Sequence, residues 1–178
     1  MTAIPLVSGR DVERAVPPER ALAAVRDAFV RFAGGEWTMQ PKLYVTNYPA
    51  GDFRAMPALG GGHALLKWVT SFPGNPARGL PTVTGLVVLS DAETGMPEAV
   101  FDAGAVTALR TGAAAVVAAE TLARADASTW AVIGVGVNGE ASARMLAASG
   151  REPLLWDLDD ERAREVALRV GGLSLIHI

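Results

Sequence analysis

Two kinds of residue that often build active sites are almost missing from this sequence. Among its 178 residues it has no cysteine and only two histidines, His63 and His177. Without cysteine the chain can form neither a disulfide nor a nucleophilic thiolate, and two histidines are too few for a typical histidine-based metal site. We therefore expect no metal centre, and catalysis would have to rest on other side chains.

Long apolar runs and an excess of basic charge are missing as well. No uninterrupted apolar stretch approaches the roughly 20 residues of a membrane span, and the first residues lack the basic and apolar segments of a secretion signal. The net charge is −3 with scattered basic residues, which argues against nucleic-acid binding. Half of the residues are hydrophobic, enough for a sizeable core. These features indicate a globular cytoplasmic protein with no membrane or nucleic-acid partner.

The first hundred residues predict an α+β unit with a mixed or antiparallel sheet. Ser8 and Asp11 have the spacing of a helix cap, and a second helix, ending before Gly34, has an apolar face that we expect to cover the sheet. Asp102 caps a long helix over residues 104–124, whose small residues permit close backbone approach to a neighbour. Glycine, proline and aspartate turns separate the expected strands, at residues 40–47, 53–58, 63–70, 81–90 and 96–101.

A different pattern begins near residue 129. An apolar strand is followed at once by Gly134, Gly136 and Gly139 in the spacing GxGxxG, then by a helix, a second apolar strand and Asp157. In dinucleotide-binding domains the three glycines allow, respectively, a tight turn, close approach of the pyrophosphate, and packing of the helix on the strand. Asp157 lies 23 residues after Gly134, near the spacing of the acid that binds the adenine ribose. The alternative is another α/β turn that simply requires glycine.

The first turn of the helix after this glycine motif is expected to bind the phosphates. A helix start presents unpaired backbone N–H groups and the positive end of the helix dipole. The expected donors are the N–H groups of Val137, Asn138 and Gly139.

Acidic residues follow the ribose-binding position. Asp157 is followed by Asp159, Asp160 and Glu161, and no arginine in this stretch precedes Arg162. Such a cluster repels a 2′-phosphate. The sequence therefore favours NAD over NADP as the cofactor.

Lysine is rare in a chain that otherwise uses arginine. Of 16 basic residues only Lys42 and Lys67 are lysines, and Lys67 lies inside the apolar run 65–69. An unpaired ammonium in apolar surroundings costs several kcal/mol, so we interpret Lys67 as functional, the alternative being a surface lysine whose stem covers the sheet edge. Arg110, within the small-residue helix, is either an exposed charge or a guanidinium directed at an anion.

Two domains are expected, and the second is short. Residues 1–125 would form the first domain with its connecting helix, and residues 126–172 the first part of a Rossmann domain, in which two parallel strands are recognisable. We interpret residues 173–178 as a non-native tail. The alternative is that they form a genuine third strand.

Several strings of residues resemble a known family. The strings LKWV, FPGN, GLPT and ALRTGA make the chain similar to the ornithine cyclodeaminase and mu-crystallin family over roughly residues 5 to 172. The resemblance implies an N-terminal substrate domain with a mixed sheet, an incomplete Rossmann domain, and homodimers that form through the substrate domains in the full-length protein.

The resemblance also implies roles for single residues. Lys67 and Arg110 would bind the substrate carboxylate, with Lys67 also acting in catalysis, and Thr82 would lie close by. Thr111 would approach the nicotinamide side of the cofactor. Lys42 stands where the family commonly has an arginine that contacts the carboxylate, a departure that would affect substrate choice.

The implied activity is NAD-dependent oxidation of a small amino or imino acid at its α-carbon. Ornithine cyclodeamination is the default reaction, with alanine dehydrogenation, ketimine reduction and a non-catalytic nucleotide-binding role as alternatives. The family's catalytic aspartate lies in the second half of its Rossmann domain and has no counterpart here. We therefore expect the 178-residue chain itself to be inactive.

Overall fold

A computed structural model describes residues 3–175 of the chain, which fold as two compact units. One unit comprises the residues up to Ala15 together with Ala28–Thr107, and the other comprises Val16–Asp27 together with the residues from Ala108 onward. Two of the three boundaries along the chain fall inside helices, α2 (Pro18–Ala33) and α3 (Ala103–Leu122), which contribute residues to both units.

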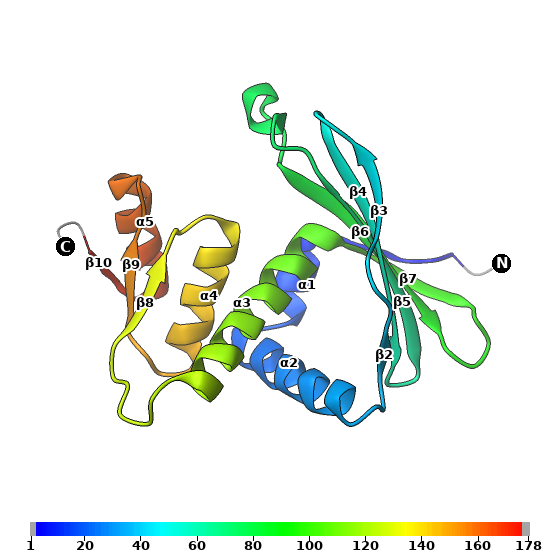
Figure 1. Cartoon of the computed structure of the whole chain (residues 1–178), viewed down its shortest axis with the longest axis horizontal. Coiled ribbons are helices and arrows are strands. Elements are labelled where there is room, and N and C mark those ends of the chain that lie inside the picture. Colours follow the sequence, from blue (N-terminus) through cyan, green and yellow to red (C-terminus); the bar gives the residue numbers. More distant parts are fainter. Residues whose placement is uncertain (1–2, 176–178) are drawn as a thin grey trace. The chain divides into compact units, whose positions relative to one another are not determined.

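The first unit is built on a seven-stranded mixed sheet (Figure 1). Its strands follow the order β1-β7-β6-β5-β4-β2, with β3 paired to β4. Only the β1–β7 pair is parallel, so the predicted mixed sheet is confirmed. The unit also contains the short helix α1 (Gly9–Ala15) and a 3-10 turn, η1 (Asn75–Arg78). The strands are β1 (Leu6–Val7), β2 (Thr38–Met39), β3 (Leu43–Asn47), β4 (Gly51–Gly60), β5 (His63–Ser71), β6 (Val83–Asp91) and β7 (Pro97–Asp102).

The second unit contains a three-stranded parallel sheet in the order β10-β9-β8. Leu155 in β9 is fully buried and packs with side chains of both α4 and α5, so both helices cover the face toward which Leu155 points. This strand–helix alternation is the predicted beginning of a doubly wound fold. The elements are β8 (Trp130–Ile133), α4 (Val137–Ala148), β9 (Pro153–Trp156), α5 (Asp160–Val170) and β10 (Leu173–Ser174).

Small side chains let α3 approach α4 closely, as the sequence predicted. A Cβ atom added to Gly112 would lie 2.7 Å from the backbone carbonyl carbon of Ala141 in α4. Ala113 and Val116 of α3 are buried in the same contact with Met145.

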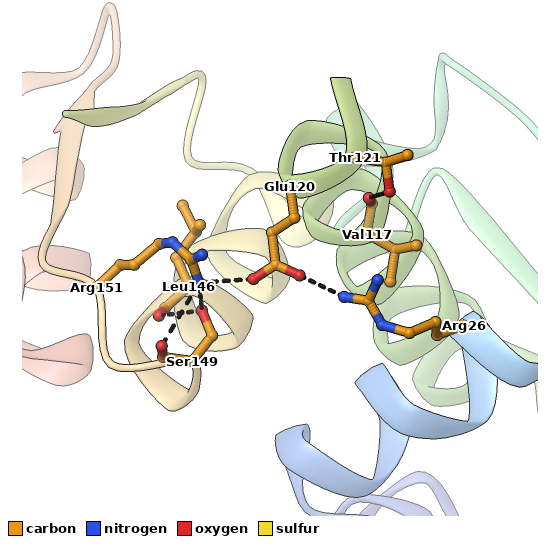
Figure 2. Close-up of polar contacts among 7 residues, drawn as sticks. All are labelled: Arg26, Val117, Glu120, Thr121, Leu146, Ser149 and Arg151. Carbon is orange, nitrogen blue, oxygen red and sulfur yellow. Dashed lines mark hydrogen bonds and ion pairs between the residues drawn. The ribbon is translucent and has the colours of Figure 1, made fainter. Parts of the chain in front are cut away.

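The first half of α2 belongs to the second unit. Its buried residue, Ala21, packs with side chains of α3 and α4. Figure 2 shows an ion network that links α2, α3 and the segment after α4. Glu120 of α3 accepts hydrogen bonds from Arg26 at 2.5 Å and from Arg151 at 2.6 Å, and Arg151 also lies over the ring of Trp130. Because these contacts join residues far apart in the sequence, helical periodicity alone could not reveal them.

The chain after residue 172 is only partly described. Leu173 and Ser174 pair in parallel with β9, opposite Leu154 and Leu155. Residues 176–178, which belong to the predicted non-native tail, lie outside the described residues. Two short strands, β1 and β2, were not predicted, since two residues carry too little pattern to be recognised.

Candidate functional site

The glycine motif forms a tight turn between β8 and α4. Gly134 has a φ of 86°, a conformation that favours glycine, and a side chain at Gly139 would collide with the carbonyl oxygen of Gly134. A Cβ atom at Gly134 or Gly136 would meet no atom within 4 Å. The roles predicted for Gly134 and Gly139 within the fold are thus visible, and open space lies beside the turn at Gly136.

The N-terminus of α4 has donors available for a ligand. Gly136 is the N-cap residue and supplies no capping side chain, while the N–H of Glu140 donates to its carbonyl at 2.8 Å. The earlier N–H groups of the helix, those of Val137, Asn138 and Gly139, have no intrahelical acceptor. A helix start of this kind attracts anions such as a pyrophosphate.

Asp157 connects the end of β9 to the glycine turn. Its Oδ2 atom accepts from the N–H of Val135 at 2.7 Å, and its Oδ1 atom accepts from the N–H of Asp159 at 3.0 Å and from Arg162 at 2.6 Å. The backbone N–H of Asp159, followed by the Arg162 guanidinium and the N–H of Val135, lowers the pKa of Asp157 to about 2. A carboxylate offers about four acceptor positions, so three bonds leave one for a ribose hydroxyl.

Thr111 lies beside Gly112, the residue at which α3 touches α4. Its buried hydroxyl oxygen has no hydrogen-bond partner in the described part of the chain. Buried hydroxyls are normally paired, so an unpaired one next to a helix contact is a candidate ligand group. Together with the open glycine turn and the ionised Asp157, this hydroxyl fits a dinucleotide cofactor.

Lys67 lies in the middle of β5 and is buried, with 8% of its surface exposed. It is flanked by Met56 in β4 and Val87 in β6, and its Nζ atom is 3.5 Å from the Oγ1 atom of Thr107 in α3. Lys42 precedes β3 by one residue. Since Leu43 pairs with Ala55, Lys42 comes next to Met56 on the side of the sheet that Lys67 faces.

Arg110 follows Thr107 by three residues on α3, so the two side chains project from the same side of this helix. Burial lowers the pKa of Arg110, and no carboxylate pairs with it among residues 3–175. By surface area Arg110 is nevertheless exposed, as one of the two alternatives from the sequence held. A guanidinium without a counter-charge is suited to binding an anion.

Thr82 is less well placed for the role implied by the resemblance. Its carbonyl accepts from the N–H of Phe72 at 2.8 Å, at the entrance to β6. Val87, the residue opposite Lys67, is five residues farther along, or roughly 16 Å of extended strand. The structure does not bring Thr82 next to Lys67, and its role remains a prediction.

Two residues next to the predicted site were not assigned roles from the sequence. Thr107 contacts Lys67, and Arg162 contacts Asp157. Helical spacing offered a signal in the first case, because Thr107 and Arg110 are three residues apart. Helical spacing gave no signal for the contact between Arg162 and Asp157, because this contact depends on the Arg162 side chain turning back toward the end of β9.

Comparison with known proteins gives this arrangement a family. Residues 5–173 match the model of the ornithine cyclodeaminase/mu-crystallin family. The chain belongs to this family. Over 131 residues it is 47% identical to the alanine dehydrogenase of Archaeoglobus fulgidus, an alignment that covers 74% of this chain and 40% of that enzyme. The family predicted from the sequence is thereby confirmed.

Solved structures of ornithine cyclodeaminase/mu-crystallin family relatives support the fold. An archaeal alanine dehydrogenase dimer with bound NAD superposes with a TM-score of 0.89 at 37% identity, covering 98% of this chain and 56% of that one. The Δ1-pyrroline-2-carboxylate reductase of Thermococcus litoralis, in complex with NADH and L-proline, gives a TM-score of 0.86 at 26% identity, covering 96% and 56%. The chain therefore spans about half the length of the relatives it matches.

The low pKa of Asp157 predicts how stability depends on pH. Its value is about 2 in the folded chain against a usual 3.8, so the charged carboxylate stabilises the fold above about pH 4 and loses this effect as the pH falls toward 2. Urea unfolding at about pH 5.5 and about pH 3 should show a larger fall in midpoint for the wild type than for Asp157→Asn. The unfolding midpoint of Asp160→Asn, which removes a neighbouring carboxylate, should fall by as much as that of the wild type. Equal falls for the wild type and Asp157→Asn would contradict the assignment.

Proposed function

We propose that this chain is the cofactor-binding and substrate-binding part of an NAD-dependent enzyme that transfers hydride to or from the α-carbon of a small amino or imino acid. The observation that carries the proposal is the glycine turn that leads into an uncapped helix and is fastened by the ionised Asp157. Membership of a family whose relatives include an alanine dehydrogenase and an imine reductase supports it.

The cofactor half of the proposal uses residues of the second unit. We assign the pyrophosphate to the N–H groups at the start of α4 and the adenine ribose to Asp157. Thr111 would contact the nicotinamide side through its unpaired hydroxyl. When bound, NAD supplies the hydride acceptor at its nicotinamide ring.

The substrate half uses cations. Lys67 and Arg110 would bind the carboxylate, a planar guanidinium and an ammonium together fixing the orientation of the α-carbon. Lys42 would contribute a third cation from the same sheet face as Lys67. A buried lysine near other cations can also hold or release a proton, which would let Lys67 polarise an imine or orient a water molecule.

The products of the reaction depend on the step after oxidation. Attack by a second amine of the substrate gives cyclodeamination, attack by water gives the alanine dehydrogenase reaction, and the reverse direction reduces a cyclic ketimine. The 47% identity to an alanine dehydrogenase favours a small substrate with one amine. If nucleotide binding is retained but no substrate is turned over, the protein would instead be a nucleotide-binding protein without catalytic activity.

We place the protein in the cytoplasm.

Binding of the cofactor can be tested in the chain itself. Gly136→Val adds a side chain into open space, so we expect a folded protein that has lost NADH binding, because the side chain fills the volume proposed for the pyrophosphate. Gly74→Val, also with open space around its Cβ position and outside the site, is the matched control and should bind normally. The measurement is NADH fluorescence titration, with circular dichroism to verify folding. Retained binding in Gly136→Val would refute the placement.

The role of Lys67 can be tested in the full-length protein by following NADH absorbance with L-alanine, L-ornithine and a cyclic ketimine. Lys67→Met removes the buried charge and should lower kcat/KM by roughly 100-fold or more for whichever substrate reacts. Arg164→Met removes an exposed cation on α5 and should leave activity close to the wild type. Normal activity in Lys67→Met would exclude the proposed role.

We further propose that the protein forms a homodimer through the open face of the sheet in the first unit. Strand alternation puts Trp68 and Leu86 opposite each other on the face away from Lys67, with Leu43 and Val45 farther along the same face. All four are exposed large apolar residues, an arrangement typical of an interface. The archaeal relative is a dimer, which supports a dimeric state for this protein.

Sedimentation velocity tests this assembly. The wild type should sediment as a dimer, and Leu86→Glu should shift it to a monomer, because a charge buried at an apolar interface is costly. Leu168→Glu, at an exposed site on α5, is the matched control and should remain dimeric. A dimeric Leu86→Glu variant would place the interface elsewhere.

A further inference from the structure

A charged pair lies where the proposed cofactor would present its adenine ribose. Asp157 follows β9 directly, and Arg162 is the third residue of α5. The guanidinium Nη2 atom donates to the Oδ1 atom of Asp157 at 2.6 Å, while the backbone N–H of Arg162 donates to the capping carboxylate of Asp159 at 3.1 Å. The helix cap fixes the backbone, and the carboxylate fixes the side chain.

The two partners differ in their exposure to solvent. Asp157 is almost fully buried, whereas about half of the Arg162 side chain is exposed. A guanidinium carries five N–H donors, and within residues 3–175 the only side-chain bond of Arg162 is the one from Nη2. Donors of Arg162 therefore remain available to a ligand at the carboxyl end of β9.

We propose that Arg162 is a latent ligand for a 2′-phosphate, which Asp157 holds inactive and which, with Asp157, sets the choice between NAD and NADP. This inference rests on the proposed nucleotide-binding function. In the wild type the carboxylate neutralises the guanidinium and repels the phosphate dianion. Loss of the carboxylate charge removes the repulsion and frees an arginine that can bind a phosphate through paired N–H donors.

A latent arginine ligand differs from simple repulsion in one respect. If the acidic residues only repel a phosphate, removal of one negative charge improves NADPH binding whether or not Arg162 is present. If Arg162 is the latent ligand, the improvement requires its side chain. A double-mutant cycle separates the two accounts.

The experiment measures dissociation constants for NADH and NADPH by fluorescence titration of the 178-residue chain. Asp157→Asn keeps an oxygen that can accept from the N–H of Val135, so the turn retains this contact. We expect the wild type to prefer NADH, and Asp157→Asn to reduce the preference by about tenfold or more. Adding Arg162→Ala should abolish that gain, whereas adding Arg164→Ala, the matched control on α5, should preserve it.

Each outcome is decisive once circular dichroism shows that the variants are folded. No gain in Asp157→Asn, or a gain that survives Arg162→Ala, overturns the role of Arg162 while NADH binding by the wild type still supports the proposed function. If the folded wild type binds neither nucleotide, the proposed function itself fails, and the role of Arg162 fails with it.

Discussion

One buried carboxylate is the constraint on which the glycine turn of the second unit depends. Asp157 holds the N–H of Val135, so this residue of the glycine turn has its backbone fastened to the end of β9. The Val135 side chain is buried in the core with Ala143 and Leu155. Both the N–H and the side chain of Val135 are directed into the protein. The chain then enters α4 through Gly136, which provides no side-chain cap. The helix start is therefore left with donors that a ligand must satisfy.

A comparable constraint organises the sheet of the first unit. Burying the ammonium of Lys67 is costly unless polar partners surround it, and Thr107 supplies one from α3. Alternation along β5 then directs the neighbouring Trp68 to the opposite face, where it lies across from Leu86. One face of the sheet can thus serve a charged ligand while the other serves an apolar partner, and a register shift of one residue would exchange the two roles.

The parts of this structure that depend on local sequence were predictable. The glycine turn, the acid after β9 and the caps at Ser8 and Asp102 involve contacts over short spacings or a well-defined motif, and all were found where expected. Contacts between distant segments were not. The packing of Ala21 on α3 and α4 depends on tertiary structure, and nothing in its helical periodicity shows which surface it meets.

The residues of the candidate site also differ in how far the sequence could predict them. Lys67 could be singled out because a charge is unusual in such apolar surroundings, whereas the role of Arg110 came only from the family resemblance. Thr107 is an ordinary helix residue until the helix is placed against β5. Arg162 was noted in the sequence only as the first arginine after the acidic cluster. Its contact with Asp157 depends on the direction of one long side chain, which a residue pattern does not specify.

The string ALRTGA shows how many separate requirements one helical segment can meet. Arg110 presents a guanidinium without a carboxylate partner among the described residues. Thr111 contributes a buried hydroxyl that has no hydrogen-bond partner in the same part of the chain. Gly112 permits contact with the backbone of α4, and Ala113 is fully buried against it. A larger residue at Gly112 would push α3 away from α4, and the Thr111 hydroxyl would move with it. The close packing of small residues between α3 and α4 would therefore also set the positions of the polar groups on α3.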